Sequence, residues 1–206
     1  MTEELLSAIY DSQEATAHAA RMWSESQAWY FSNWMPEIEA PGAWWSQYAP
    51  SFQRFLPDPP ARVLDIGSNN GSLVLSLRFK HYEAYGVDLP EVVERARKLL
   101  PSIAELLFPL NLEFDDLPGA DYDIVLALSV MEHLVNWRAF LPKVARVMKP
   151  EAVFYMTSPN GRKAGKEHWH WRQFTLEELV ALGAESGLVT IWADAMTASL
   201  GVAFQK

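Results

Sequence analysis

The stretch that decides the fold is VLDIGSNNGSLVLSL, which runs from Val63 to Leu77. It begins with an apolar run typical of a buried β-strand, passes through a turn of small polar residues, and continues with apolar residues at helical spacing. Gly67 and Gly71 allow this turn to bend tightly and let a ligand approach the backbone closely. In open parallel sheets the turn after the first strand is the usual contact for a ligand. We therefore expect a strand, a binding turn and a helix here.

From Arg62 onward, strand-like and helix-like segments alternate, which favours an α/β fold with a parallel sheet covered by helices. Strands are expected at 62–67, at 83–88, within 104–114, at 121–129, at 152–158 and as a pair within 188–206. Helices are expected after Asn70, from Pro90, over 136–149 and over 175–187. The last helix carries a capping box, with Thr175 followed by Glu178, and ends at Gly187.

The region before this alternation, residues 1–60, has apolar positions at helical spacing and many aromatic side chains. The aromatic residues are Trp23, Trp29, Tyr30, Phe31, Trp34, Trp44, Trp45 and Tyr48. We expect a helical, aromatic-rich N-terminal cap over 1–60 and a main domain over 61–206. Two readings of the rings stay open: they pack the helices onto the main domain, or they form a lid in which Trp34 lines an acceptor pocket.

The composition narrows the function classes. Half of the 206 residues are hydrophobic, which argues for a globular core and against disorder. The formal charge of -9 argues against extended surfaces for nucleic acid or anionic membranes. Cysteine is absent, which excludes disulfides and thiolate sites. The N-terminal stretch has no basic leader, and no apolar run approaches the ~18 residues of a membrane span, so we expect a cytoplasmic location.

The binding turn differs from a dinucleotide fingerprint. Such a fingerprint has the spacing G-x-G-x-x-G and directs helix amides at a pyrophosphate, whereas this turn places Gly67, Asn69 and Gly71 at alternate positions. Asp65 adds a negative charge just before the turn, which suits a cationic ligand better than a phosphate. The turn therefore indicates a positively charged ligand.

Three motifs in this order resemble the class I S-adenosylmethionine-dependent methyltransferases: DIGSNNG at 65–71, YGVDLP at 85–90 and YDIVLALSVMEHL at 122–134. LPKVARVMKP at 141–150 is similar to the helix that precedes the family's fifth strand. The resemblance covers 62–206 and implies a Rossmann-like three-layer sandwich. Its sheet would have seven strands, mostly parallel with a reversed C-terminal strand, and the helical N-terminal extension would be added to it.

The resemblance implies S-adenosyl-L-methionine as the cofactor. The turn would approach its methionine end, and Asp88 would accept hydrogen bonds from both ribose hydroxyls, although a helix cap ahead of Pro90 is a competing role for this acid. The adenine contact after the third strand has two possible registers, at Asn111 and Leu112 or at Glu113. The cofactor-binding residues implied are Asp65, Gly67, Ser68, Asn69, Gly71, Asp88, Leu89, Asn111, Leu112, Glu113, Leu128 and Ser129.

His133 is the candidate catalytic residue, because an imidazole titrates near neutrality and this position faces the cleft in the resembling family. A structural histidine is the alternative. Glu132 is expected to hold a helix or loop in place. The basic segment after the fifth strand suggests an anchor for an acidic group of the acceptor, or simply a solvated loop. The candidate acceptor-binding residues are Trp34, Arg162, His168, His170 and Arg172.

We expect no metal site, because His168 and His170 lack a nearby carboxylate or cysteine pattern in the sequence. The favoured function is methyl transfer to an oxygen or nitrogen of a small or medium-sized acceptor that can be anionic. The alternatives are an RNA or protein methyltransferase and a catalytically silent cofactor-binding scaffold. A small-molecule partner is expected, with no nucleic acid and no membrane, and the sequence does not indicate an oligomeric state.

Overall fold

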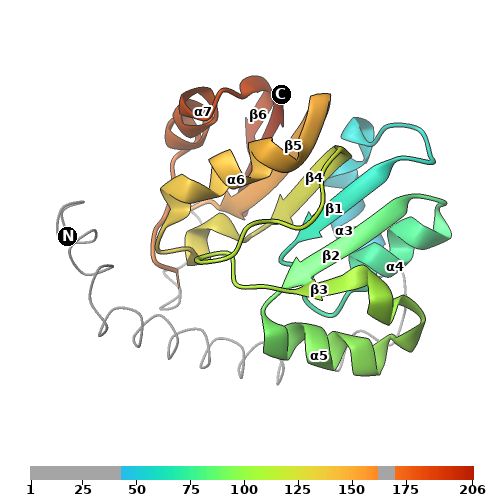
Figure 1. Ribbon diagram of the computed structural model, residues 1–206. Helices are drawn as coiled ribbons and strands as arrows, with labels where there is room; N and C mark the ends of the chain where they lie inside the picture. The colour runs from blue at the N-terminus through green and yellow to red at the C-terminus, as the bar shows by residue number, and fades with distance from the viewer. Residues whose placement is uncertain (1–42, 162–169) are drawn as a thin grey trace, which may run out of the picture.

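Seven strands form one sheet in the order β3-β2-β1-β4-β5-β7-β6, and β7 runs antiparallel to both of its neighbours (Figure 1). This computed structural model describes residues 43–161 and 170–206. The mostly parallel sheet with a reversed C-terminal strand confirms the fold class expected from the sequence. The strands are β1 Arg62–Ile66, β2 Glu83–Asp88, β3 Leu107–Pro109, β4 Tyr122–Leu128, β5 Met148–Pro159, β6 Val189–Ala195 and β7 Ser199–Gln205.

Helices cover both faces of the sheet, as the alternating pattern requires. The α-helices are α3 Ala43–Phe52, α4 Ser72–Phe79, α5 Pro90–Leu99, α6 Phe140–Val147 and α7 Leu176–Glu185. Short 3₁₀ helices lie at η2 Gln53–Phe55, η3 Pro101–Leu106, η4 Met131–His133 and η5 Trp137–Ala139. Proline occupies the first turn of α5, and the capping box of α7 is present with both of its hydrogen bonds.

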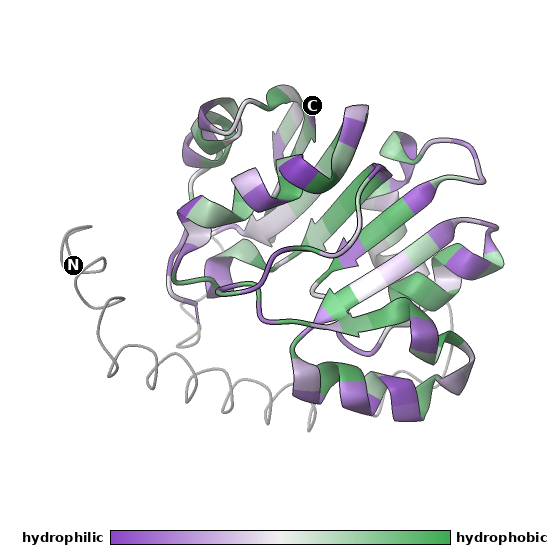
Figure 2. Cartoon of the chain, in the orientation of Figure 1, coloured by the Kyte–Doolittle hydropathy of each residue, from purple (hydrophilic) through white to green (hydrophobic). Residues whose placement is uncertain are grey.

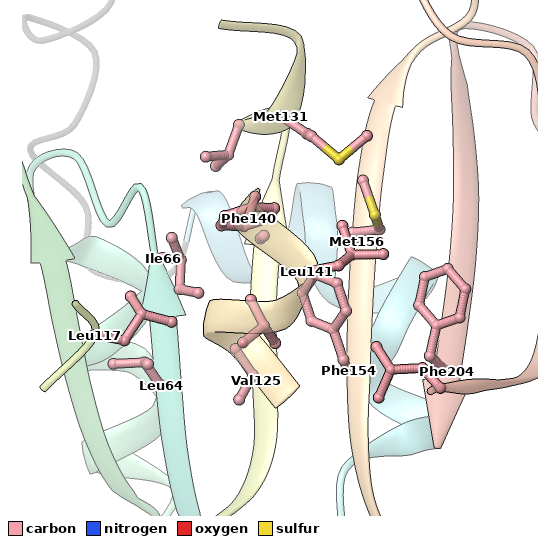
Figure 3. Packing of buried hydrophobic residues seen from close by; sticks show 14 of the residues in the cluster. Leu64, Ile66, Leu117, Val125, Met131, Phe140, Leu141, Phe154, Met156 and Phe204 are labelled. Carbon is pink, nitrogen blue, oxygen red and sulfur yellow. The ribbon is translucent and has the colours of Figure 1, made fainter. Parts of the chain in front are cut away.

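The hydrophobic core is divided by the sheet into two layers. Residues of α3, α4 and α5 pack on one face, and residues of α6 and α7 pack on the other. Green, hydrophobic strands lie at the centre of Figure 2, and purple residues lie along the outer sides of the helices. Figure 3 shows the second layer, in which Phe154 lies between Phe140 and Phe204, with ring centroids 6.1 Å and 5.9 Å away. The sheet is thus fixed from both sides.

The expected helix over 136–149 is wrong in its bounds. The chain forms η5 and then the shorter α6, and Met148 already belongs to β5, where it pairs with Tyr122. The register then shifts, and Glu151 adopts a left-handed backbone with φ of 64° before β5 continues. The third strand, placed somewhere within 104–114, is only three residues long and ends at Pro109, as suits the edge of a sheet.

The described part of the N-terminal region is α3 with η2. Ala49 and Phe52 are buried against the sheet, and Phe55 stacks on Tyr155 with ring centroids 5.6 Å apart. This end of the region therefore packs onto the main domain. Trp34 and the other residues before position 43 lie outside the described residues. Among the residues that the structure describes, none of the helices is both long and apolar enough to span a membrane.

Candidate active site

The turn after β1 is fastened to the end of β2. The backbone N–H groups of Gly67 and Ser68 donate to the carbonyl oxygen of Val87, at 2.9 Å and 3.0 Å. Gly67, Asn69 and Gly71 all have positive φ, at 72°, 49° and 78°. Glycine and asparagine tolerate this left-handed conformation better than other residues. The residues that the sequence singled out therefore give the turn its shape.

Asp88 lies at the end of β2, beside this turn. Its carboxylate accepts hydrogen bonds from the N–H groups of Asn69 and Leu89, each at 2.7 Å. Helix α5 begins immediately afterwards, and within the described residues no side chain caps its first turn. The carboxylate therefore ties the turn after β1 to the residue that precedes α5 and does not cap α5.

Two acidic side chains lie close together at this edge of the sheet. Burial raises the pKa of Asp65 well above its usual value, and repulsion from Asp88 raises it further. Burial also raises the pKa of Asp88 to about 6, against the opposing effect of its two N–H partners. Buried negative charges of this kind are stabilised by a nearby positive charge. The pair therefore favours a cationic ligand.

Close approaches bring the turn into contact with β2 and with the segment that follows β4. An added Cβ on Gly86 would lie 2.7 Å from the side chain of Ser68, and one on Gly67 would lie 2.6 Å from Val130 Cγ2. Neither Gly86 nor Val130 was identified from the sequence. A glycine inside a strand often marks a close approach of another backbone, so Gly86 carried a signal that could have been used. For Val130 the sequence offered no such signal.

Val130 leads directly into η4, which carries Glu132 and His133. Met131 anchors η4 by burying its side chain in the core (Figure 3). Ser129, which has φ of 55°, is held by Thr157: its N–H lies 3.1 Å from both the carbonyl oxygen and Oγ1 of that residue. The end of β4, with Leu128 and Ser129, is thereby fixed against β5. His133 is partly exposed, unlike its neighbour Glu132.

Glu132 is 1% exposed. Burial raises the pKa of its carboxyl to about 8, although the Ser158 and Ser129 hydroxyls act in the opposite direction. Its backbone carbonyl accepts a hydrogen bond from the N–H of Trp171 at 2.9 Å, which ties the segment after β5 to η4. The expectation that Glu132 holds a loop agrees with this contact, which is made by its backbone.

This tie brings His170 next to His133, with ring centroids 4.9 Å apart. Arg172 turns inward: its guanidinium pairs with Glu178 at 2.7 Å and lies 4.6 Å from the ring centre of Trp137. These two contacts of the Arg172 guanidinium hold the segment before α7 in place. Arg162 and His168, two other acceptor-binding candidates, lie outside the described residues.

The two alternatives for the adenine contact both follow β3. Asn111 and Leu112 come first, and Asn111 Oδ1 accepts from the N–H of Glu113 at 3.0 Å. The Glu113 carboxylate accepts from the N–H groups of Val135 and Asn136, at 2.6 Å and 3.1 Å. Glu113 thus fastens the loop after η4. The other alternative is also held by the protein, because the N–H of Asn111 donates to Asp115 at 2.7 Å and the carbonyl oxygen of Leu112 accepts from Lys143 at 2.8 Å.

The residues at this edge fit S-adenosylmethionine. The Ser68 hydroxyl is buried and has no hydrogen-bond partner among the described residues, as expected beside a polar ligand. The Asp88 carboxylate can accept further hydrogen bonds, as ribose hydroxyls require. The acidic pair formed by Asp65 and Asp88 suits a ligand with sulfonium and ammonium groups.

Comparison with known proteins bears on this site. A family model described as "Methyltransferase domain" matches residues 44–194. A probable S-adenosylmethionine-dependent methyltransferase of Mycobacterium tuberculosis is 26% identical over 165 residues, which cover 76% of this chain and 60% of that protein. A ubiquinone biosynthesis O-methyltransferase of Bradyrhizobium diazoefficiens is 31% identical over 128 residues, covering 60% of this chain and 46% of that one. The chain thus spans only about half to three fifths of the length of these relatives.

A solved structure shares the fold over nearly the whole chain. The 1,6-didemethyltoxoflavin-N1-methyltransferase of Burkholderia thailandensis, crystallised with 1,6-didemethyltoxoflavin and S-adenosylhomocysteine, superposes with a TM-score of 0.69. The match covers 95% of this chain and 90% of that one at 18% identity, so it supports the fold alone. The family model, in contrast, covers well over half of the sequence. By that match and the ordered motifs, the chain belongs to the class I S-adenosylmethionine-dependent methyltransferases.

Proposed function

We propose that this chain transfers a methyl group from S-adenosylmethionine to an oxygen or nitrogen atom of a small or medium-sized acceptor. The observation that carries the proposal is the arrangement of Asp88, whose carboxylate oxygens are each held by one N–H group at 2.7 Å beside the turn 67–71. Each oxygen retains a lone pair, so the carboxylate can accept hydrogen bonds from two neighbouring ribose hydroxyls.

The acceptor class rests on the relatives and on charge. One structural neighbour is a 1,6-didemethyltoxoflavin-N1-methyltransferase crystallised with 1,6-didemethyltoxoflavin, and one relative is named as an O-methyltransferase of ubiquinone biosynthesis. The net charge of -9 weighs against a long polyanion. The basic residues around Arg162 and His168 favour an acceptor with an anionic group, and Trp34 remains a proposed contact.

When bound, S-adenosylmethionine supplies an activated methyl group on its sulfonium. The chain's own contribution is alignment, which can account for up to about 7–11 kcal/mol of a barrier. The turn 67–71 and Asp88 hold the cofactor, and Val130 packs on Gly67 at the start of the segment that carries His133. The cofactor turn and the segment leading into η4 are thus in contact at the same end of the sheet.

His133 is the residue that we assign to the acceptor's proton. It is partly exposed and is the last residue of η4, the short helix that follows β4. An imidazole there can hold or remove a proton from a hydroxyl or a protonated amine, a contribution of typically ~10²- to 10⁴-fold in rate. Asp65 and Asp88 lie at the cofactor end of the site, where their raised pKa values indicate that a nearby positive charge would stabilise them.

Calorimetry with S-adenosylhomocysteine, followed by a cofactor-consumption screen over acceptor classes, tests this proposal. On the acceptor found, His133→Ala should lower kcat by ~10²-fold or more, while the affinity for S-adenosylhomocysteine stays near that of the parent. His81→Asn is the matched control, because His81 is exposed, lies between α4 and β2, and has a φ of 69° that asparagine tolerates.

Failure of the parent chain to bind S-adenosylhomocysteine would contradict the proposal as a whole. If the cofactor binds but His133→Ala keeps the turnover of the parent, the assignment of His133 is wrong and methyl transfer itself stands. The first result tests whether the chain binds the cofactor, and the second tests whether His133 contributes to turnover.

A further inference from the structure

Three side chains that can bind a metal ion meet beyond the ends of β4 and β5. Glu132 and His133 come from η4, and His170 comes from the segment before α7. One ligand atom from each residue lies within 4.8 Å of the other two. The cluster was not expected from the sequence, because Glu132 and His170 lie 38 positions apart along the chain (170 − 132).

The carboxylate of Glu132 is the second, independent observation. The residue is 1% exposed, and neither of its carboxylate oxygens has a hydrogen bond of good geometry within the described residues. The hydroxyl of Ser158, which is also buried and lies near enough to affect the Glu132 carboxyl, makes no hydrogen bond of good geometry in the same part of the chain. A buried carboxylate is costly unless it is hydrogen-bonded, paired or bound to a metal ion. Among the residues that the structure describes, the Glu132 carboxylate therefore lacks hydrogen bonds of good geometry that would offset the cost of its burial.

The backbone holds the two halves of the cluster together. The carbonyl oxygen of Glu132 accepts from the N–H of Trp171 at 2.9 Å, so His170 is fixed one residue away from this hydrogen bond. The rings of His133 and His170 meet edge to face at 64°, with centroids 4.9 Å apart. A shift of about 1 Å would bring the three ligand atoms to the spacing set by metal–ligand bonds of ~2.0–2.2 Å.

We propose that Glu132, His133 and His170 bind one divalent transition-metal ion. Two imidazoles and one carboxylate form the ligand set of many catalytic zinc sites and of non-haem iron sites, and this set leaves positions open for another ligand. Magnesium prefers oxygen ligands in an octahedral arrangement and suits this set poorly. Zn²⁺, Mn²⁺, Fe²⁺ and Co²⁺ are the matching ions.

The metal site adds a role in methyl transfer to the proposed function. It rests on that function for the identity of the molecule that binds the ion beside the three side chains, which is the methyl acceptor. A hydroxyl oxygen of the acceptor occupies an open position of the ion, which lowers the pKa of that hydroxyl. The O–H proton would leave to solvent water, and the oxygen would attack the methyl carbon with the electron pair that it keeps. The bond from sulfur to that methyl would break, and its electrons would stay on sulfur, which gives S-adenosylhomocysteine. His133 is then a metal ligand, and the ion takes over the proton-withdrawing role assigned to the imidazole. The acceptor class narrows to molecules with a hydroxyl group.

The experiment uses the full chain, freed of metal with a chelator and titrated with Co²⁺, whose visible absorption reports its ligands. We expect about one Co²⁺ per chain, displaced by Zn²⁺ and not by Mg²⁺. Glu132→Gln, His133→Ala and His170→Ala should each weaken Co²⁺ binding by at least ~10-fold. His81→Asn removes an exposed histidine outside the cluster and should bind Co²⁺ like the parent.

Affinity for S-adenosylhomocysteine and far-ultraviolet circular dichroism show whether each variant is folded. Glu132→Gln keeps the size of the buried side chain, so it tests the charge even if His133→Ala and His170→Ala perturb the segment. Co²⁺ affinity unchanged in both Glu132→Gln and His170→Ala overturns the site, as does a parent chain that binds no Co²⁺ while it binds S-adenosylhomocysteine. Binding of Co²⁺ without binding of S-adenosylhomocysteine upholds the metal site and contradicts the proposed function instead.

Discussion

Asp88 is buried, which disfavours its charged form, and it is also hydrogen-bonded in a way that favours that form. It is desolvated enough for its pKa to rise to about 6, yet it accepts two backbone hydrogen bonds that favour its charged form. These contacts fix the direction of the carboxylate before any ligand arrives. A preorganised acceptor of this kind contributes to binding because little rearrangement is needed.

The charge state of Asp88 makes cofactor affinity depend on pH. As the pH falls through about 6, Asp88 takes up a proton, and a protonated carboxyl accepts ribose hydrogen bonds less well. We expect the affinity for S-adenosylhomocysteine to fall by up to ~10-fold per pH unit below this value. Calorimetry at about pH 7.5 and about pH 5 measures the change.

Asp88→Asn is the control for this pH dependence. It should bind S-adenosylhomocysteine more weakly at neutral pH, by ~1.5–3 kcal/mol for each charge-assisted hydrogen bond lost, and change less between the two pH values. The contribution of Asp88 to folding runs the other way, because its pKa is raised in the folded state: that contribution is full below about pH 4 and is lost as the pH rises through 6. Equal pH dependence in parent and variant would contradict the assignment.

Single residues also mark where sequence reasoning reached its limit. The positions of Asp65 and Asp88 near the ends of β1 and β2 could be predicted, because each lies beside a recognisable motif, and their cofactor contacts stay a prediction. Glu132 was expected only to hold a loop, since its burial and its approach to His170 depend on contacts between segments far apart in the chain. Gly86 leaves room for the side chain of Ser68, and Val130 packs against Gly67. Such contacts between distant segments cannot be read from the order of residues in the sequence.

At the scale of elements, α7 is seated on β7 through a glycine. Gly183 is buried, and a Cβ added there would lie only 2.1 Å from Cε1 of Phe204. Phe204 has no room to retreat, because it is fully buried and stacks on Phe154. This close helix–sheet approach sets the depth at which α7 packs.

Gly183→Ala should therefore destabilise the protein, although alanine is the better helix former by ~1 kcal/mol. Overpacking a tight core typically costs about 1–3 kcal/mol, and we expect a net loss within that range in the free energy of unfolding measured with urea. Glu185→Ala is the control on the same helix, because Glu185 is exposed and should change the stability by less than ~0.5 kcal/mol. A Gly183→Ala variant as stable as the parent would show that α7 can shift outward.

The bounds of elements were predicted well where a local signal marks them. Pro90 and the capping box of Thr175 and Glu178 gave the starts of α5 and α7 correctly. The junction of α6 and β5 was missed, because sheet pairing of Met148 with Tyr122 overrides the helical pattern of the preceding residues. A proline or a capping box sets the start of a helix locally, whereas pairing with a distant strand can move the point at which a helix ends.

At the scale of the whole molecule, the strand order brings the candidate residues Asp65, Asp88 and His133 to the same end of the sheet. β1 and β4 are neighbours at the centre of the sheet, and β2 and β5 flank them, so their carboxyl ends carry Asp65, Asp88, His133 and the segment of His170. The crossover rule for parallel sheets allowed this edge to be predicted from the sequence. The distances between the side chains at this edge could be known only from the structure.

The same view defines the smallest part of the chain that should bind the cofactor. Helix α3 belongs to the core, since Phe52 is fully buried and lies 6.1 Å from Tyr155, ring centre to ring centre. Residues before position 43 contribute none of the proposed cofactor contacts. A chain that lacks 1–42 should therefore bind S-adenosylhomocysteine with about the affinity of the full chain, while losing turnover if Trp34 contacts the acceptor.

A longer deletion, of 1–56, provides the contrast, because it also removes α3 and η2 with the buried ring of Phe52. Losing one such ring typically costs about 3–5 kcal/mol, a large share of the stability of a domain. We expect this chain to unfold at a much lower temperature or to be insoluble. If removal of 1–42 already abolishes S-adenosylhomocysteine binding in a folded chain, the N-terminal region belongs to the cofactor site, and the division into a cap and a binding domain is wrong.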